Sequence, residues 1–598
     1  SDVDIDELNR HRYVTGKEGY RQANYNYAWY NNPYFAAAEW RQQQENRLTD
    51  ARVSLRWQPL PSLRLQGRAA VRENRVFEET KSPKSYLNFD DPREGNYSLR
   101  HAGTQTVDTD VLLSFSRSLS EKIGMALNTG ASLYRRTFHE ERLSTDGLIL
   151  PGLYSLANSA APPTASNDFA QEQTGSFYAT ADIDVDNGLF LHLTARSDKS
   201  SSLPPMHDTY FYPSLSVSAL LSRYLRLPAT VDYLRLSASL ATVSASLPPY
   251  SIYPLYGQGV TYGQTPAVTY PDVIVNTDIR PDRSRSGEIS LSAAFFGNRL
   301  GVDMAAYGIV DDNLIIDFPV SEASGFEARR VNGNRYLTRG LEAVIRAHLL
   351  DLQHLDWHTT LNWSRSVTRL TDIYGGGERY GNLLAGDRAD AYYATVWQRT
   401  ADGQLLLDAN GLPVKDPVPH RLGHTAPDWT FGLQNRFVIG RFEVDIDVDG
   451  AVGGLLRSIT TEKLWWGGRH PLSVSMRDAE LAAGGTAVYV PEGIVVENGE
   501  NTANTHAVRW QTWCQTYPYQ AAVTASEDPL FANVFSRSFV KLRRLSISYS
   551  LPRLTITLFG NNLAVWKRIP YVDPDFGDDD NLQDPSARYV GMGVKWRL

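Results

Sequence analysis

The segment "WTFGLQNRFVIGRFEVDIDVDG" (429–450) contains two alternating stretches of apolar and polar residues, separated by a short turn. Successive side chains of a β-strand point to opposite faces. One face of the second stretch is apolar throughout and comprises Phe442, Val444, Ile446 and Val448. The opposite face carries four carboxylates, those of Glu443, Asp445, Asp447 and Asp449. The segment therefore predicts a β-hairpin with one apolar face and one acidic face.

The end of the chain, "RYVGMGVKWRL" (588–598), has the same alternating pattern. Its apolar residues are Val590, Met592, Val594, Trp596 and Leu598. Lys595 and Arg597 lie on the other face. In a soluble β-sandwich the apolar face meets a core, whereas in an outer-membrane barrel it meets lipid and the polar face lines the lumen.

Alternating segments recur along the whole chain, mostly in pairs, and predict about seventeen strands. They cover 51–59, 63–71, 109–118, 123–136, 175–185, 189–196, 212–221, 231–241, 287–296, 300–310, 340–349, 355–366, 429–438, 442–450, 539–550, 554–560 and the final stretch. Within a pair the link is short. Between pairs it is long, as in 75–104, 138–173, 199–209, 242–285, 311–339, 367–428, 451–538 and 561–587.

Strict alternation of short and long links distinguishes between the candidate folds. Compact soluble domains rarely contain long structureless loops, whereas outer-membrane barrels have short periplasmic turns at one rim and long extracellular loops at the other. The prediction is therefore an all-β protein, a transmembrane antiparallel β-barrel in the cell outer membrane. Membrane lipid and lipopolysaccharide would surround it. Because segment 51–59 runs towards the periplasm in this scheme, we expect preceding strands that these 598 residues do not include.

Composition narrows the function. No run of about 18 apolar residues predicts a membrane-spanning helix. The net charge of −8 disfavours nucleic acid as a partner. The single cysteine, Cys514, excludes an internal disulfide framework, and its role stays open.

Several stretches resemble the SusC/RagA class of TonB-dependent outer-membrane transporters of Bacteroidetes. They include "GLILPGLYSLANS" (147–159), "VNGNRYLTRGLEAVI" (331–345), "FVKLRRLSISYSLP" (539–552) and "LFGNNLAVWKRIPYVDPDF" (558–576). The resemblance runs through most of the chain in family order. It mildly departs at Leu598, where an aromatic residue is usual.

The resemblance implies a barrel of about 22 strands, plugged by an N-terminal domain. It also implies import of oligosaccharides or peptides, a SusD-like surface lipoprotein as partner, and energy from TonB. We expect residues 1–598 to be the C-terminal part of such a receptor, with the N-terminal extension, plug domain and first strands outside them. TonB would act through that outside region.

Two alternatives are kept open: an outer-membrane barrel enzyme, and a soluble carbohydrate-binding β-protein. The sequence contains no HExxH, GxSxG or P-loop motif. We therefore expect a protein without catalytic residues and without a cofactor, apart from the candidate calcium site described below.

Three groups of residues are candidate sites. The longest link carries aromatic residues suited to ligand contact, partner contact or packing of the loop itself: Trp510, Trp513, Tyr517 and Tyr519. The carboxylates of 443–449 are expected to line the lumen, as a solute path or a docking surface for basic groups of a plug. A third cluster of carboxylates could supply hard oxygen ligands for a structural Ca²⁺, or it could simply be a solvated acidic loop. Its members are Asp573, Asp575, Asp578, Asp579 and Asp580.

Overall fold

A computed structural model describes residues 3–27, 30–87, 95–259, 265, 267–497, 500–575, 579–580, 582 and 585–597. Its main feature is a 17-stranded sheet in which each strand pairs with the next sheet strand along the chain. The pairings are antiparallel throughout. The predicted all-β, antiparallel fold is confirmed.

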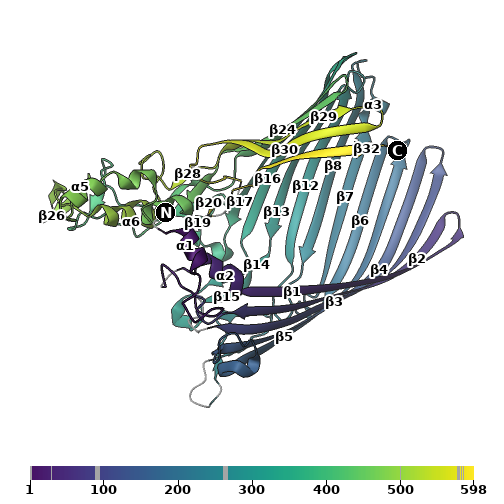
Figure 1. Ribbon diagram of the computed structural model, residues 1–598. Helices are drawn as coiled ribbons and strands as arrows, with labels where there is room; N and C mark the ends of the chain where they lie inside the picture. The colour runs from purple at the N-terminus through teal and green to yellow at the C-terminus, as the bar shows by residue number, and fades with distance from the viewer. Residues whose placement is uncertain are drawn as a thin grey trace.

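The sheet strands correspond one to one with the predicted segments. They are β1 (Arg41–Leu60), β2 (Leu63–Ser82), β3 (Asn96–Ser120), β4 (Ile123–Leu148), β5 (Ser159–Val185), β6 (Leu189–Ser200), β7 (Thr209–Leu220), β8 (Val231–Ala245), β12 (Asp282–Phe295), β13 (Leu300–Asp312), β16 (Arg335–Leu352), β17 (Leu355–Asp372), β23 (Trp429–Ile439), β24 (Phe442–Val452), β29 (Phe539–Ser550), β30 (Leu554–Lys567) and β32 (Tyr589–Trp596). Figure 1 shows the sheet curving from β1 round to β32.

Most connections alternate in length, as predicted. The exception lies around β7, where the link 201–208 is shorter than the link 221–230 that follows. Because neighbouring strands are antiparallel, successive connections lie at opposite ends of the sheet. Short turns such as 61–62 and 121–122 share one end, which we call the short-turn rim. The long connections, among them 373–428 and 453–538, share the other end, the long-loop rim (Figure 1).

Two long links are shorter than the sequence suggests. The link expected over 75–104 is only 83–95, because β2 and β3 remain paired from Ser82↔Asn96 onwards. The link expected over 138–173 is 149–158, between Leu148 and Ser159. These strand ends are mostly polar, and their few apolar residues do not form a regular alternation. Beyond the edge of the membrane the outer face no longer contacts lipid, so the strands can remain hydrogen-bonded without apolar residues on that face.

The C-terminal strand presents the apolar face that its sequence predicts. On β32 the exposed side chains include Val590, Met592, Val594 and Trp596, at 61–80%. Lys595 alternates with them and therefore points to the opposite face. Leu598 lies outside the described residues.

A tight turn at 186–188 joins β5 and β6, as its sequence "DNG" predicts. Asp186 and Asn187 have φ values of 56° and 49°. Positive φ at both central residues is the requirement of a type I′ hairpin turn, and Asp and Asn tolerate it better than most residues.

The two longest connections fold together, and we call them the loop domain (373–428 and 453–538). The first contains β18 (Arg379–Tyr380), β19 (Leu383–Leu384), β20 (Ala391–Ala394), β21 (Leu406–Leu407) and β22 (His420–His424). The second contains β25 (Leu455–Ser458), α4 (Ile459–Trp466), α5 (Arg477–Ala482), β26 (Ile494–Glu497), β27 (Glu500–Ala503), α6 (Trp510–Gln520) and β28 (Val534–Ser536). Strand β21 pairs with β26 and joins the two connections.

The remaining α-helices and strands are small. They are α1 (Ile5–Arg10), α2 (Pro33–Glu39), α3 (Leu221–Tyr224), β9 (Gly257–Gln258), β10 (Val268–Thr269), β11 (Val273–Ile274), β14 (Leu314–Pro319), β15 (Ala328–Gly333) and β31 (Asp579–Asp580). Helices α1 and α2 precede β1 at the long-loop rim (Figure 1). Within the described part of the chain, no helix is long and apolar enough to cross a membrane.

Candidate functional site

The loop domain has a hydrophobic core to which both connections contribute. Trp397, Leu405 and Leu407 come from the first connection and pack with residues of the second. The indole nitrogen of Trp397 donates a hydrogen bond to the carbonyl of Tyr517 at 3.0 Å. Arg399 forms an ion pair with Glu527 at 2.7 Å. The two connections therefore form one folded unit at the long-loop rim, seen as the green helices and strands of Figure 1.

Most of the aromatic residues predicted from the longest link belong to this core. Trp510, Trp513 and Tyr517 are each at most 4% exposed. They lie on α6 at helical spacing, which places them on one face of the helix. The ring of Trp513 stacks on that of Tyr517 with centroids 4.8 Å apart. Packing within the loop therefore accounts for most of the surface of these three residues, and direct ligand contact stays a prediction for the group.

Cys514 lies on the same face of α6 and is buried in the same core. Burial raises the pKa of its thiol to about 12. The thiolate, which is the reactive form of cysteine, is therefore scarce at neutral pH. The side chain packs as a small apolar group.

A pocket of about 570 Å³ opens between α4, α5 and α6. Its lining includes one exposed aromatic side chain and several polar ones: Trp466, Arg477, Glu480, Arg509, Gln511 and Gln515. The guanidinium of Arg509 lies 3.0 Å from the carboxylate of Glu480. The pocket thus combines a flat apolar surface with charges of both signs.

The four carboxylates of β24 lie on the polar face of the sheet, but three are already paired. Glu443 contacts Arg436 of β23. Asp445 lies 3.1 Å from Arg544 of β29, and Asp449 accepts a hydrogen bond from Arg543 at 2.8 Å. Arginines of neighbouring strands therefore balance most of the charge of this face. Its role as a solute path or as a docking surface stays a prediction.

Asp447 differs from the other three carboxylates. It faces the same side of β24, and no ion pair to it is found within the described ranges. It is therefore the carboxylate of this group with the least compensation by a cationic partner.

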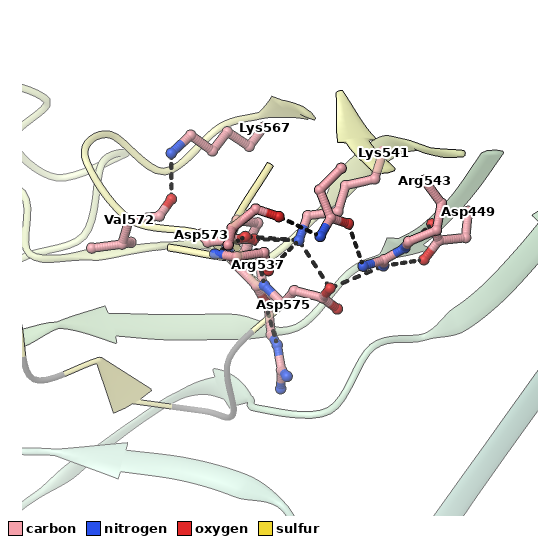
Figure 2. A network of polar contacts seen from close by, with 12 residues as sticks. Asp449, Arg537, Lys541, Arg543, Lys567, Val572, Asp573 and Asp575 are labelled. Atoms are coloured by element: carbon pink, nitrogen blue, oxygen red, sulfur yellow. Dashed lines mark hydrogen bonds and ion pairs between the residues drawn. The ribbon is translucent and has the colours of Figure 1, made fainter. Parts of the chain in front are cut away.

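The acidic cluster near the C-terminus binds cationic side chains of the chain itself (Figure 2). The ammonium of Lys541 lies 2.7 Å from Asp573 and 2.9 Å from Asp575. Arg543 lies 2.9 Å from the same Asp575 and also holds Asp449. Lys541 is buried at 2% exposure. Asp573 and Asp575 therefore bind a lysine and an arginine of the chain, and a calcium site in this cluster stays a prediction.

The same contacts explain the acidity of these carboxyl groups. Burial by itself raises the pKa of Asp573, but hydrogen bonds from Lys541 and Ser586 outweigh it and leave the pKa below its ordinary value. The pKa of Asp575 is lowered in the same way, by Lys541 and Arg543 against burial. Both groups are charged at neutral pH.

Of the other three aspartates in the cluster, only Asp580 has a described side chain, and its role is different. The carboxylate of Asp580 accepts a hydrogen bond from the backbone N–H of Thr460 at 2.6 Å. It thereby caps the first turn of α4, where free N–H groups and the helix dipole favour a negative charge. Asp578 lies outside the described residues, as does the side chain of Asp579.

Sequence reasoning missed a row of polar contacts across β2, β3, β5 and β6. Arg68 lies 2.7 Å from Asp110, and the hydroxyl of Tyr178 donates to the same carboxylate. The guanidinium of Arg196 lies 5.7 Å from the Tyr178 ring centroid and donates to Asp198 at 2.8 Å. The sequence places each residue on a polar face, but only the pairing register brings them together.

Comparison with known proteins gives a consistent family. The family model described as "TonB dependent receptor-like, beta-barrel" matches residues 2–563. The TonB-dependent receptor P3 of Formosa agariphila is 22% identical over 515 residues, which cover 74% of this chain and 47% of that protein. The TonB-dependent receptor P26 of the same organism is 20% identical, over 84% of this chain and 54% of that protein. The chain thus spans about half the length of these curated relatives.

Solved structures show the same fold. The structure of the RagAB peptide transporter matches 97% of this chain and 65% of its own chain, with a TM-score of 0.74 and 15% identity. The RagAB peptide importer in the "closed-closed" state matches 95% and 63%, with a TM-score of 0.75 and 16% identity. At this level of identity the likeness concerns the fold.

Proposed function

This chain belongs to the TonB-dependent receptor-like β-barrel family of outer-membrane transporters, and we propose that it takes part in importing peptides across the outer membrane. The polar face of the sheet would line the path, and the barrel would perform no chemistry. TonB would supply energy through a plug outside residues 1–598. With this orientation, the long-loop rim is extracellular and the short-turn rim is periplasmic.

The pocket of the loop domain is the observation that carries the proposal. It lies on the extracellular side and offers Arg477 and Arg509 beside Glu480. Charges of both signs suit the carboxylate and ammonium groups of a peptide. The RagAB structures, which this chain resembles in fold, are named as a peptide transporter and importer. A peptide is therefore the substrate class that we favour.

An oligosaccharide is the second candidate, because one aromatic residue is exposed at the pocket. Trp466 is 47% exposed, and its ring lies 6.3 Å from that of Tyr519. A flat aromatic face can pack against the apolar face of a sugar ring. A substrate of this class would depend on the ring of Trp466 more than on the charges of Arg509 and Glu480.

We also propose a SusD-like surface lipoprotein as the partner of the loop domain. Several apolar side chains of this domain are between 42% and 74% exposed, namely Leu472, Val474, Leu481, Val490 and Val496. Exposed apolar patches often mark protein contacts. A lid that covers the domain would bury them and enclose the pocket.

Point variants at the pocket test these proposals without removing α6 from the core of the domain. The intact protein, with its plug, is expressed in the native host as wild type, Trp466→Ala or Arg509→Gln. Labelled oligopeptides and oligosaccharides are then supplied separately. Met206→Ala is the matched control, because Met206 is 84% exposed on a different long connection.

The outcomes separate the substrate classes. Loss of peptide uptake in both pocket variants, with the control unaffected, supports the proposal. Loss of oligosaccharide uptake in Trp466→Ala alone favours the second candidate. Normal uptake of both in every variant refutes a role for the pocket. Co-purification of the lipoprotein with Leu481→Asp is measured in parallel, and undiminished recovery argues against the proposed partner surface.

A further inference from the structure

Two imidazoles and one carboxylate meet on the polar face of the β16–β17 hairpin, close to its turn. His348 of β16 is directly opposite His358 of β17, and their rings stack with centroids 4.1 Å apart. The Nε2 atoms of the two histidines lie 2.8 Å and 3.0 Å from the same oxygen of Asp356. The three potential ligand atoms all lie within 4.8 Å of one another.

These close atoms are not explained by ordinary hydrogen bonds. Nε2 of His348 and Oδ1 of Asp356 are buried, and neither has a hydrogen-bond partner of acceptable geometry within the described part of the chain. Buried polar atoms are almost always satisfied. Two ring nitrogens directed at one carboxylate oxygen, without hydrogen bonds, form an arrangement that a central cation would satisfy.

The surrounding charges also favour a cation. Asp351 is directly opposite Asp356 across the hairpin, and like charges in that position destabilise a sheet. Arg436 is the nearest residue opposite His358 on β23. Its guanidinium is already engaged by Glu443. Arg436 still interacts electrostatically with Asp356, and a cation bound beside Asp356 would offset the rest of the repulsion between the two aspartates.

We propose that His348, His358 and Asp356 form a binding site for a divalent transition-metal ion of the Zn²⁺ type. Imidazole nitrogen and carboxylate oxygen bind Zn²⁺ at about 2.0–2.2 Å, so ligand atoms in a tetrahedral site are about 3.3–3.6 Å apart. The present separations of 2.8 Å and 3.0 Å need only a small outward rotation of the side chains. Water completes the coordination.

The nature of the ligands selects the metal class. Ca²⁺ and Mg²⁺ prefer oxygen ligands alone, whereas imidazole suits Zn²⁺, Cu²⁺ and Ni²⁺. The three ligands come from both strands of one hairpin, on the lumen side of the periplasmic rim. A bound metal therefore cross-links β16 to β17 at the turn. This inference is independent of the proposed substrate.

Metal binding by the intact, untagged protein in detergent tests the proposal. The metal-stripped protein is titrated with Co²⁺, whose visible absorption reports tetrahedral nitrogen and oxygen ligands, and Zn²⁺ is then used to displace it. We expect one Co²⁺ per chain at this site. His348→Ala, His358→Ala and Asp356→Asn should each weaken binding by more than about tenfold, because even indirect contacts to a metal ligand contribute that much.

His192→Ala is the matched control. His192 also lies beside an aspartate of the neighbouring strand, Asp182, at 2.5 Å. It does not belong to the cluster of His348, Asp356 and His358, however, so it lacks a second imidazole ligand. Binding by this control should equal that of the wild type. Absence of Co²⁺ absorption in the wild type, or unchanged affinity in folded His348→Ala and His358→Ala, overturns the proposal. Folding of each variant is checked by the far-UV CD spectrum of its β-structure.

Discussion

The ammonium nitrogen of Lys541 lies 2.7 Å from a carboxylate oxygen of Asp573, and both side chains are at most 7% exposed. Lys541 belongs to β29 in the barrel wall, whereas Asp573 belongs to the connection that leads from β30 to β32. This buried ion pair fastens the last extracellular connection to the wall (Figure 2).

Replacing Lys541 with methionine should release this connection. Removal of one partner of a buried ion pair costs about 3–5 kcal/mol, because the other charge stays buried without compensation. We expect faster hydrogen exchange in the described parts of the connection between β30 and β32, with little change in β6 and β7. The double variant Lys541→Met with Asp573→Asn should recover much of the protection, since no lone charge remains. Equal protection in the single variant and the wild type would contradict the ion-pair account.

Acid should loosen the same connection. The pKa of Asp573 is lower in the folded protein than its ordinary value of about 3.9. The stabilisation of the folded connection by charged Asp573 is complete when the pH is above the ordinary pKa. It is lost as the pH falls through the lower pKa of the folded protein. Hydrogen exchange of the connection, corrected for its intrinsic pH dependence, should therefore be constant from pH 7 to 5 and should increase below about pH 4. Loss of protection already at pH 6 would indicate a different titrating group.

The barrel was predictable because lipid demands a repeating pattern. In 442–450, apolar and polar residues alternate one by one, so the two faces of the strand can be assigned from the sequence. The "DNG" turn at 186–188 has a defined backbone requirement. The extra length of β2 to β5 was not predictable from alternation, because beyond the lipid the strands are mostly polar and their apolar residues are scattered. There, only the hydrogen-bonded ladder between strands determines where pairing ends.

The candidate sites were harder to predict, because they depend on register and on tertiary packing. Lys541 and Asp573 meet only when the connection folds back over β29. The hairpin of 340–349 and 355–366 was predicted, yet the pairing of His348 with His358 depends on the irregular register between His348 and Leu350. The spacing of Trp510, Trp513 and Tyr517 contained a helical signal. The length and polarity of the link 451–538 nevertheless favour a loop over a helix.

Cys514 should resist alkylation in the folded protein. Because burial raises its pKa to about 12, its thiolate fraction at pH 8 is about three orders of magnitude below that of an ordinary cysteine. Maleimide labelling followed by mass spectrometry should be slow until denaturant is added. Gln511→Cys in a Cys514→Ser background is the control, since residue 511 is exposed one turn earlier on α6. Similar labelling rates at the two positions would show that the core of the loop domain opens readily.

A charge on the apolar face of β32 should cost more at Val590 than at Val594. Val594 pairs with Ile556, close to the periplasmic end of β30, whereas Val590 pairs with Gly560. Four residues of a strand tilted by about 40° separate the two positions by roughly 10 Å of membrane depth. Val590→Arg should therefore lower the free energy of unfolding in lipid vesicles by about 2–4 kcal/mol, and Val594→Arg by about 0–1 kcal/mol.

Gly593→Arg is the control, because it places the same charge on the polar face, where a Cβ would meet only Thr557 at an ordinary 3.9 Å. Denaturant titration of the intact, refolded protein provides the measurement. If all three variants unfold at the same denaturant concentration, the assignment of the two faces of β32 is wrong.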